Sequence, residues 1–230
     1  MTRALALVLA VFALWPAFAV SAGEAPSAEP RSRATDVTVE LWLDGVPAIR
    51  VDAAALDQAE GQRLELRHPR IAVGDELRLA ATDGVAQLEG GAIEVHGDVD
   101  ATLDAVEQVE IRADRFSVDV RAGTGVFDGS VEVTQGTLAL MCEHLEVAYD
   151  RETDEIRSVT ASGGVEIRQG ERLGRGEEAV FDRAAGAVEL RGSPYLEEGK
   201  VRLRGQVIRF RVDGGEISCT GCRAVFGGPP

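Results

Sequence analysis

Cysteine and aromatic residues are scarce in this 230-residue chain, which has three cysteines, seven phenylalanines, two tryptophans and two tyrosines. Three cysteines cannot supply the two ligand pairs of a structural zinc site. With so few aromatic side chains, the core must be filled mostly by Val, Leu and Ile. The sequence therefore predicts an aliphatic interior and no metal centre.

Positive charge is also in deficit, because 24 Lys and Arg stand against 39 Asp and Glu, for a net charge of −15. Binding to nucleic acid requires a basic face, which this composition does not offer. The sequence also lacks a Ser/His/Asp arrangement, a Gly-rich phosphate loop and a pair of carboxylates in a cleft. We therefore expect no enzyme, no cofactor and no nucleic-acid partner.

Two short motifs contain the cysteines. Cys142 and His144 are expected on the same side of a strand, but two ligands without a third do not make a metal site. Cys219 and Cys222 form a C-x-x-C motif with no helical pattern after it, which argues against a redox site. In an exported chain this motif favours a small disulfide, and a bond from Cys142 to one of the two is the alternative.

The N-terminal segment has the layout of a secretory signal peptide, predicted over residues 1–22. Arg3 precedes the uncharged run Ala4–Ala19, and small residues follow at a cleavable position. Residues 23–35 are rich in Pro, Ser and Ala and are predicted to form a linker. The alternative is an uncleaved anchor in the inner membrane, although the run is short for a span of about 20 residues.

Helical periodicity is nearly absent, and only Ala53–Glu60 and Ala101–Glu107 allow short helices. Elsewhere apolar and polar residues alternate, as in Val131-Glu132-Val133 and Val165-Glu166-Ile167. Alternation places one side of a strand on a core and the other in water, so the glutamates are expected to face water. The fold class predicted is all-β.

An eight-residue pattern occurs twice, 34 positions apart. It is GSVEVTQG at Gly129–Gly136 and GGVEIRQG at Gly163–Gly170, with a weaker copy, GSPYLEEG, at Gly192–Gly199. A repeat of about 30 residues is typical of architectures in which each unit buries its apolar face only against its neighbours. We therefore expect a repeat-built stack of strands.

The repeated segments resemble the OstA/LptA family of periplasmic lipopolysaccharide-transport proteins. The residues that carry this resemblance are Gly129–Gln135, Leu145–Asp150, Ile156–Ile167, Glu178–Asp182 and Val188–Pro194. The resemblance implies one domain over residues 36–226, with 110–226 the best match and 227–230 a tail. Residues 36–109 are looser and also resemble LptC, the inner-membrane component of the same pathway.

The resemblance implies an incompletely closed antiparallel β-jellyroll, bent into a V around an apolar groove that takes the acyl chains of lipid A. Counting the alternation gives the inward-facing residues, which we predict to line the groove. They are Val131, Val133, Leu138, Leu140, Leu145, Val147, Tyr149, Val165, Ile167, Ala179, Phe181, Val188, Leu190, Leu196, Ile208 and Phe210.

The function implied is a periplasmic protein that binds and transports lipopolysaccharide between the inner and outer membranes. The implied partners are lipopolysaccharide, LptC-like and LptD-like jellyroll domains, and further copies of the chain arranged head to tail. Two alternatives remain at this stage. One is an LptC-like role anchored in the inner membrane, and the other is a structural β-repeat protein that carries no lipid, with its interior filled.

Overall fold

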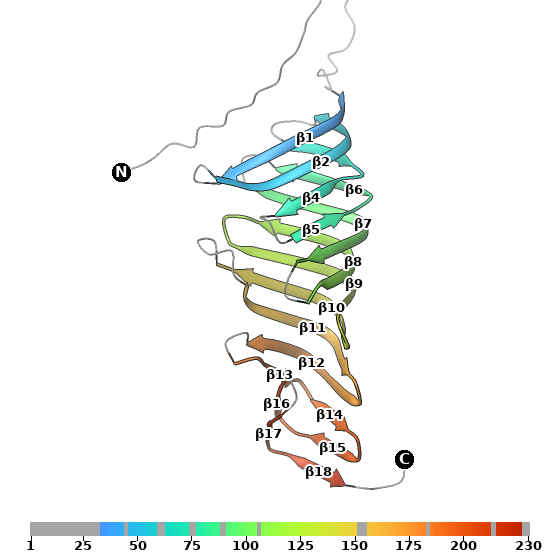
Figure 1. The fold of residues 1–230 in the computed structure, drawn as a ribbon, viewed down its shortest axis with the longest axis vertical. Coiled ribbons are helices and arrows are strands. Elements are labelled where there is room, and N and C mark those ends of the chain that lie inside the picture. Colours follow the sequence, from blue (N-terminus) through green and yellow to red (C-terminus); the bar gives the residue numbers. More distant parts are fainter. Residues whose placement is uncertain are drawn as a thin grey trace, which may run out of the picture.

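The computed structural model describes residues 33–43, 46–58, 63–73, 77–87, 91–104, 107–150, 156–182, 185–212 and 215–226. These residues form an elongated stack of antiparallel strands, in which chain order largely follows the long axis (Figure 1). The all-β prediction is confirmed. The predicted signal peptide, residues 1–22, and the tail, residues 227–230, lie outside the described residues.

Within the described ranges, eighteen strands make one continuous sheet. The first nine are β1 (Arg33–Leu43), β2 (Val46–Gln58), β3 (Arg63–Arg67), β4 (Arg70–Val73), β5 (Leu77–Ala80), β6 (Asp83–Gln87), β7 (Ala92–Leu103), β8 (Val109–Asp119) and β9 (Thr124–Gln135). The others are β10 (Leu138–Tyr149), β11 (Ile156–Gln169), β12 (Arg172–Asp182), β13 (Ala187–Arg191), β14 (Tyr195–Glu198), β15 (Val201–Arg204), β16 (Val207–Arg211), β17 (Ile217–Thr220) and β18 (Arg223–Phe226).

Two sequence-based boundaries are corrected by the strands. β1 begins at Arg33, where the chain pairs with Asp57 of β2, so the linker predicted over residues 23–35 ends before that point. The short helices allowed by the sequence do not form, because Ala53 belongs to β2 and Ala101 to β7. Both alanines are buried among neighbouring strands, where ladder pairing overrides their helical propensity.

Each long strand is broken in the middle by a corner that divides the sheet into two walls. We call wall 1 the part of the sheet that contains β4, β5, β14, β15 and β18. Wall 2 is the part that contains β3, β6, β13, β16 and β17. β1, β2 and β7–β12 cross from one wall to the other, and register shifts mark the corner in β7–β11. The result is a V whose two walls join along the corner.

The repeated octets span wall 1 from the corner to a hairpin turn. Gly129 and Gly163 lie at the corner with φ of 77° and 80°, and Gly136 and Gly170 lie in the hairpins with φ of 55° and 57°. Left-handed backbone of this kind favours glycine. The repeat therefore encodes one wall segment with a turn at each end.

The hairpins of the two walls lie opposite the corner and form what we call the mouth of the V. No ladder between described residues joins the hairpins of wall 1 to those of wall 2. The fold is thus an incompletely closed antiparallel roll, as predicted. One hydrophobic cluster fills the angle between the walls along the length of the described chain.

Candidate lipid groove and its mouth

The predicted groove residues all lie inside the V or on its inner rim. The deepest of them are buried in the core cluster: Val131, Val133, Leu145, Val165, Ile167, Ala179, Val188, Leu190, Leu196, Ile208 and Phe210. The others are half-buried: Leu138, Leu140, Val147, Tyr149 and Phe181. The interior is therefore packed near the corner, and the less buried of these apolar side chains lie toward the mouth.

Apolar side chains form an inner row on each wall because strand register places them side by side. On wall 1 the row is Ile111, Val133, Leu140, Ile167, Gly174, Leu196, Leu203 and Ala224. On wall 2 it is Gly125, Val147, Val159, Phe181, Val188, Phe210 and Ile217. The two rows face each other across the V over the C-terminal half of the chain.

Sequence reasoning missed part of this apolar surface. Val73, Leu77 and Val109 of wall 1, and Leu56 and Val159 of wall 2, are partly buried and pack against the core cluster. The repeat signal is weak upstream of residue 110, so counting from the octets did not reach most of them. The alternation of apolar and polar residues in Ile49-Arg50-Val51-Asp52-Ala53 was the sequence signal that could have found the N-terminal part.

Polar groups interrupt the apolar surface at the mouth of wall 1. Register aligns a mouth row of Val109, Gln135, Leu138, Gln169, Arg172, Glu198, Val201 and Phe226. Gln135 and Gln169 precede the last glycine of the two octets, and Gln135 donates a hydrogen bond to the carbonyl of Glu107 at 3.2 Å. The groove is thus apolar inside and polar at this stretch of its rim.

Arg172 is the one charged side chain buried among the described residues. Its Nη1 donates to the carbonyl oxygen of Arg211 at 2.9 Å, and its Nη2 donates to Oε1 of Glu198 at 2.7 Å. The guanidinium carbon also lies 5.2 Å from the centre of the Phe210 ring. Because Arg172 begins β12 in wall 1 and Arg211 ends β16 in wall 2, this side chain joins the walls across the mouth.

The outer faces of the walls are charged. Glu166 was expected to face water, but its side chain is only 15% exposed, because Arg168 and Arg175 bind it at 2.6 and 2.7 Å. Hydrogen bonds from Arg175 and then Arg168 hold the pKa of Glu166 below its ordinary value. Glu132 has no comparable pair of arginine partners among the described contacts, and it is exposed as predicted.

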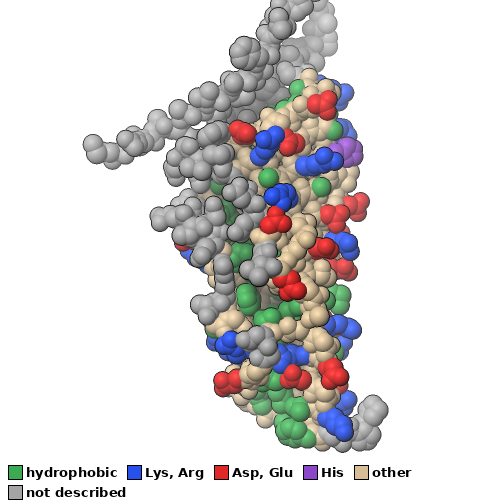
Figure 2. All heavy atoms as spheres, viewed as in Figure 1, with side chains coloured by type: hydrophobic (Ala, Val, Ile, Leu, Met, Phe, Trp, Pro, Cys, Tyr) green, Lys and Arg blue, Asp and Glu red, His purple; other side chains and the backbone are tan. Residues whose placement is uncertain are grey.

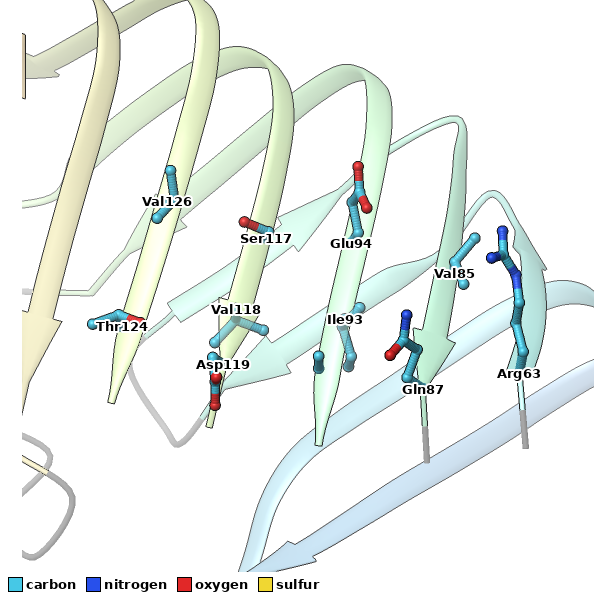
Figure 3. Close-up of a pocket in the computed structure, with 11 residues that line it drawn as sticks. Arg63, Val85, Gln87, Ile93, Glu94, Ser117, Val118, Asp119, Thr124 and Val126 are labelled. Atoms are coloured by element: carbon cyan, nitrogen blue, oxygen red, sulfur yellow. The ribbon is translucent and has the colours of Figure 1, made fainter. Parts of the chain in front are cut away.

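A hollow of about 290 Å³ lies on wall 2, lined in part by Val85, Glu94, Ser117 and Val126 (Figure 3). These residues alternate along their strands with buried ones such as Phe116, so the hollow opens on the outer face of the roll. Its lining also includes the buried Ile93 and Val118, but most of the lining side chains face outward, and we do not assign the groove to it.

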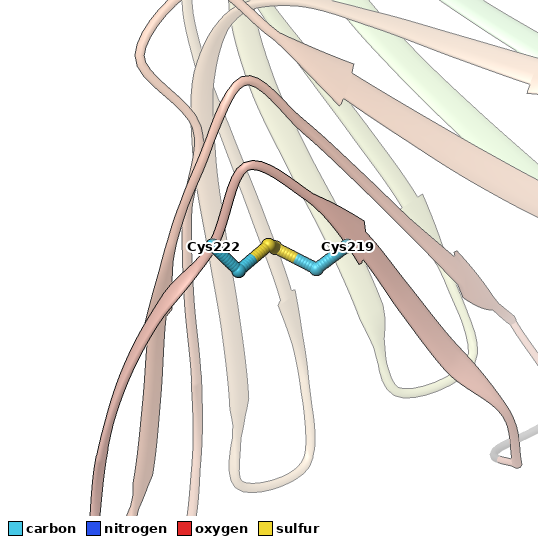
Figure 4. The surroundings of a disulfide bond; sticks show 2 residues. All are labelled: Cys219 and Cys222. Carbon is cyan, nitrogen blue, oxygen red and sulfur yellow. A yellow bond between two sulfur atoms is a disulfide. The ribbon is translucent and has the colours of Figure 1, made fainter.

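The three cysteines lie in two places. Cys219 and Cys222 are joined in a disulfide that spans the last corner, between β17 and β18 (Figure 4). Gly205 leaves room for it, because a Cβ at that position would lie 2.9 Å from each sulfur. Cys142 is a free, buried thiol.

The expectation that Cys142 and His144 share a side of the strand is wrong. The register of β10 shifts between them at the corner, so Cys142 points into the core and His144 points outward to Asp128, at 2.6 Å. Within the described ranges, no group of three His, Cys, Asp or Glu side chains is placed to hold a metal ion.

Cys142 should react very slowly with thiol reagents in the folded chain. Burial raises the pKa of this thiol from 9.0 to about 11. At pH 8 the thiolate fraction, and with it the labelling rate, should be about 100-fold lower than for a thiol of unshifted pKa. Stopped-time alkylation followed by mass spectrometry measures this rate, with the urea-unfolded chain as control. Equal rates in the two states would contradict the burial of Cys142.

Comparison with known proteins decides the family. The model of the LptA/(LptD N-terminal domain) LPS transport protein family matches residues 110–216. The chain carries a domain of the OstA/LptA family. This confirms the resemblance drawn from the repeated octets, and it assigns a role in lipopolysaccharide transport at the level of the family. Residues 36–109 lie outside the match.

One solved structure similar to this chain is LptH, described as the LptA homologous periplasmic component of the conserved lipopolysaccharide transport device from Pseudomonas aeruginosa. It is 19% identical, and the alignment covers 53% of this chain and 95% of LptH with a TM-score of 0.43. The comparison with curated proteins found no match. Among the described residues, no helix has the length and apolar character needed to cross a membrane.

Proposed function

We propose that the chain is a periplasmic carrier that holds the acyl chains of lipopolysaccharide between its two inner rows and keeps the sugars at the mouth. The observation that carries this proposal is the division of the V into apolar inner rows and a mouth row in which Gln135, Gln169, Arg172 and Glu198 bring polar groups to the rim. An amphipathic glycolipid has the same division, and each methylene buried in the rows contributes about 0.8 kcal/mol.

Half-buried residues near the mouth are the proposed first contacts of the acyl chains. Leu140 of wall 1 and Phe181 of wall 2 pack against the core cluster without being fully enclosed. The residues nearer the corner are already packed against one another, so an inserted acyl chain would lie nearer the mouth. The proposed carrier therefore loads from the mouth.

The ends of the roll are the proposed contacts with other jellyroll domains. β18 pairs with β15 and with no other described strand, so its far edge offers free backbone groups. Its Val225 and Phe226 are 45% and 73% exposed, and hydrophobic side chains gather at this end of the molecule (Figure 2). Strand addition at this edge would join the groove to that of an LptC-like or LptD-like domain, or of a second copy.

Photo-crosslinking in cells tests the carrier function. A photoreactive residue placed at Leu140 or Phe181 should capture lipopolysaccharide, and one at the exposed, outward Glu132 should not. Adducts are detected by the mass shift of the chain on immunoblots developed for lipopolysaccharide. Equal labelling at inward and outward positions, or none at either, would favour a structural β-repeat protein instead.

A further inference from the structure

Arg172 has an unusual combination of burial and incomplete bonding. Its side chain is 7% exposed, and its Nε is buried without a hydrogen-bond partner. A buried donor left unsatisfied costs about 1–3 kcal/mol, so a side chain that served only to join the walls would be expected to bond this group as well.

The free donor lies on the edge of the guanidinium that faces Glu198. Nε and Nη2 form one side of the arginine fork, which matches two oxygens of a carboxylate or phosphate. Glu198 contacts only Nη2 there, through a single oxygen at 2.7 Å. Glu198 is also 44% exposed, so it can turn into water at little cost. One of the two donors on this edge, Nη2, is thus bonded to Glu198, which can move away, and the other, Nε, has no partner.

The position of Arg172 fits the boundary of an amphipathic ligand. The Phe210 ring lies against the guanidinium on the inner side, and Phe210 belongs to the apolar row of wall 2. Gln169 and Glu198 flank Arg172 in the mouth row. A lipid with its chains between the rows would therefore present its first charged group beside this arginine.

We propose that Arg172 is an anion site for a phosphate group on the sugar of the carried glycolipid, and that Glu198 occupies the site until the lipid arrives. This rests on the proposed carrier function and adds to it the residue that recognises the headgroup. The phosphate would accept hydrogen bonds from Nε and Nη2 together, while Nη1 keeps its bond to the carbonyl of Arg211. An acidic chain would then hold an anionic lipid through one desolvated arginine rather than through a basic surface.

Binding of one acylated lipid in two forms tests this site. The full chain is titrated with bisphosphorylated lipid A and with the same lipid after enzymatic removal of its phosphates, and binding is followed by displacement of a fluorescent fatty acid. The native chain should prefer the phosphorylated form by about tenfold. R172Q should abolish this preference and leave binding of the dephosphorylated lipid within about twofold. E198Q keeps the guanidinium of Arg172 but removes the negative charge that competes with the phosphate. This variant should increase the preference for the phosphorylated lipid.

The outcomes separate this site from the carrier function. Equal affinity of the native chain for the two lipids, or an equal loss of both in R172Q, would overturn the anion site and leave the carrier intact. If neither lipid binds to the native chain, the carrier function and the anion site are both overturned. Inorganic phosphate at millimolar concentration should not displace the phosphorylated lipid, and full displacement would mean that the site serves free phosphate. Melting curves of R172Q and E198Q check that both variants fold.

Discussion

Replacing Phe210 with alanine is expected to lower the free energy of unfolding by about 3–5 kcal/mol. The ring is 1% exposed and lies in the core cluster between the walls. It fills the space above Gly174, where a Cβ would lie 3.7 Å from the ring, and it supports the guanidinium of Arg172. Its loss leaves a cavity between the two walls, next to the guanidinium of Arg172.

Urea unfolding followed by circular dichroism measures this loss. F226A is the matched control, because Phe226 is 73% exposed and its loss should change the free energy of unfolding by less than about 0.5 kcal/mol. If F210A and F226A shift the midpoint equally, the interior near Arg172 is not packed as described. F210A should also weaken binding of phosphorylated lipid, since Arg172 loses the ring that positions it.

Replacing Gly163 with alanine should cost about 3 kcal/mol, far more than the same change at the next residue. Gly163 has φ of 80°, and a Cβ there would lie 2.7 Å from Cβ of Glu143 on the neighbouring strand. Left-handed backbone and overpacking against a fixed atom each contribute about 1–2 kcal/mol. The corner between the walls must therefore open to accept the methyl group.

G164A is the control for this prediction. Gly164 has φ of 66°, but a Cβ at this position meets nothing within 4 Å. Only the cost of placing alanine in left-handed backbone remains, so the free energy of unfolding should fall by about 1 kcal/mol. Thermal unfolding of the two variants side by side separates steric fit from backbone strain. Equal losses would show that the corner has no close contact between strands at Gly163 and Glu143.

Much of the architecture followed from periodicity. Alternation of apolar and polar residues predicts strands because successive side chains of a strand point to opposite faces. The octets at Gly129 and Gly163 recur because each wall segment needs a left-handed turn at both ends, and glycine provides this conformation without steric cost. The alanine-rich starts at Ala53 and Ala101 misled the prediction of secondary structure, because strand pairing is not visible in composition.

The corner could not be predicted from alternation. A register shift of the kind found after Cys142 moves every following side chain to the opposite face of the strand. Two residues that a regular strand would place together, Cys142 and His144, therefore end on opposite faces. The count of inward-facing residues started from Val131 and Val165, and the structure buries both of these side chains in the core cluster.

The sequence by itself determined an acidic, aliphatic, all-β chain built from glycine-bounded repeats, because these properties depend on composition and on local backbone preference. The tertiary structure decided which polar side chains enter the groove. Arg172 and Glu198 lie 26 positions apart, and Arg172 and Arg211 lie 39 apart, so only pairing of β12 with β14 and the approach of the two walls bring them together. The octets mark segments of wall 1, and contacts between distant strands place the charge of Arg172 and Glu198 at the mouth of the V.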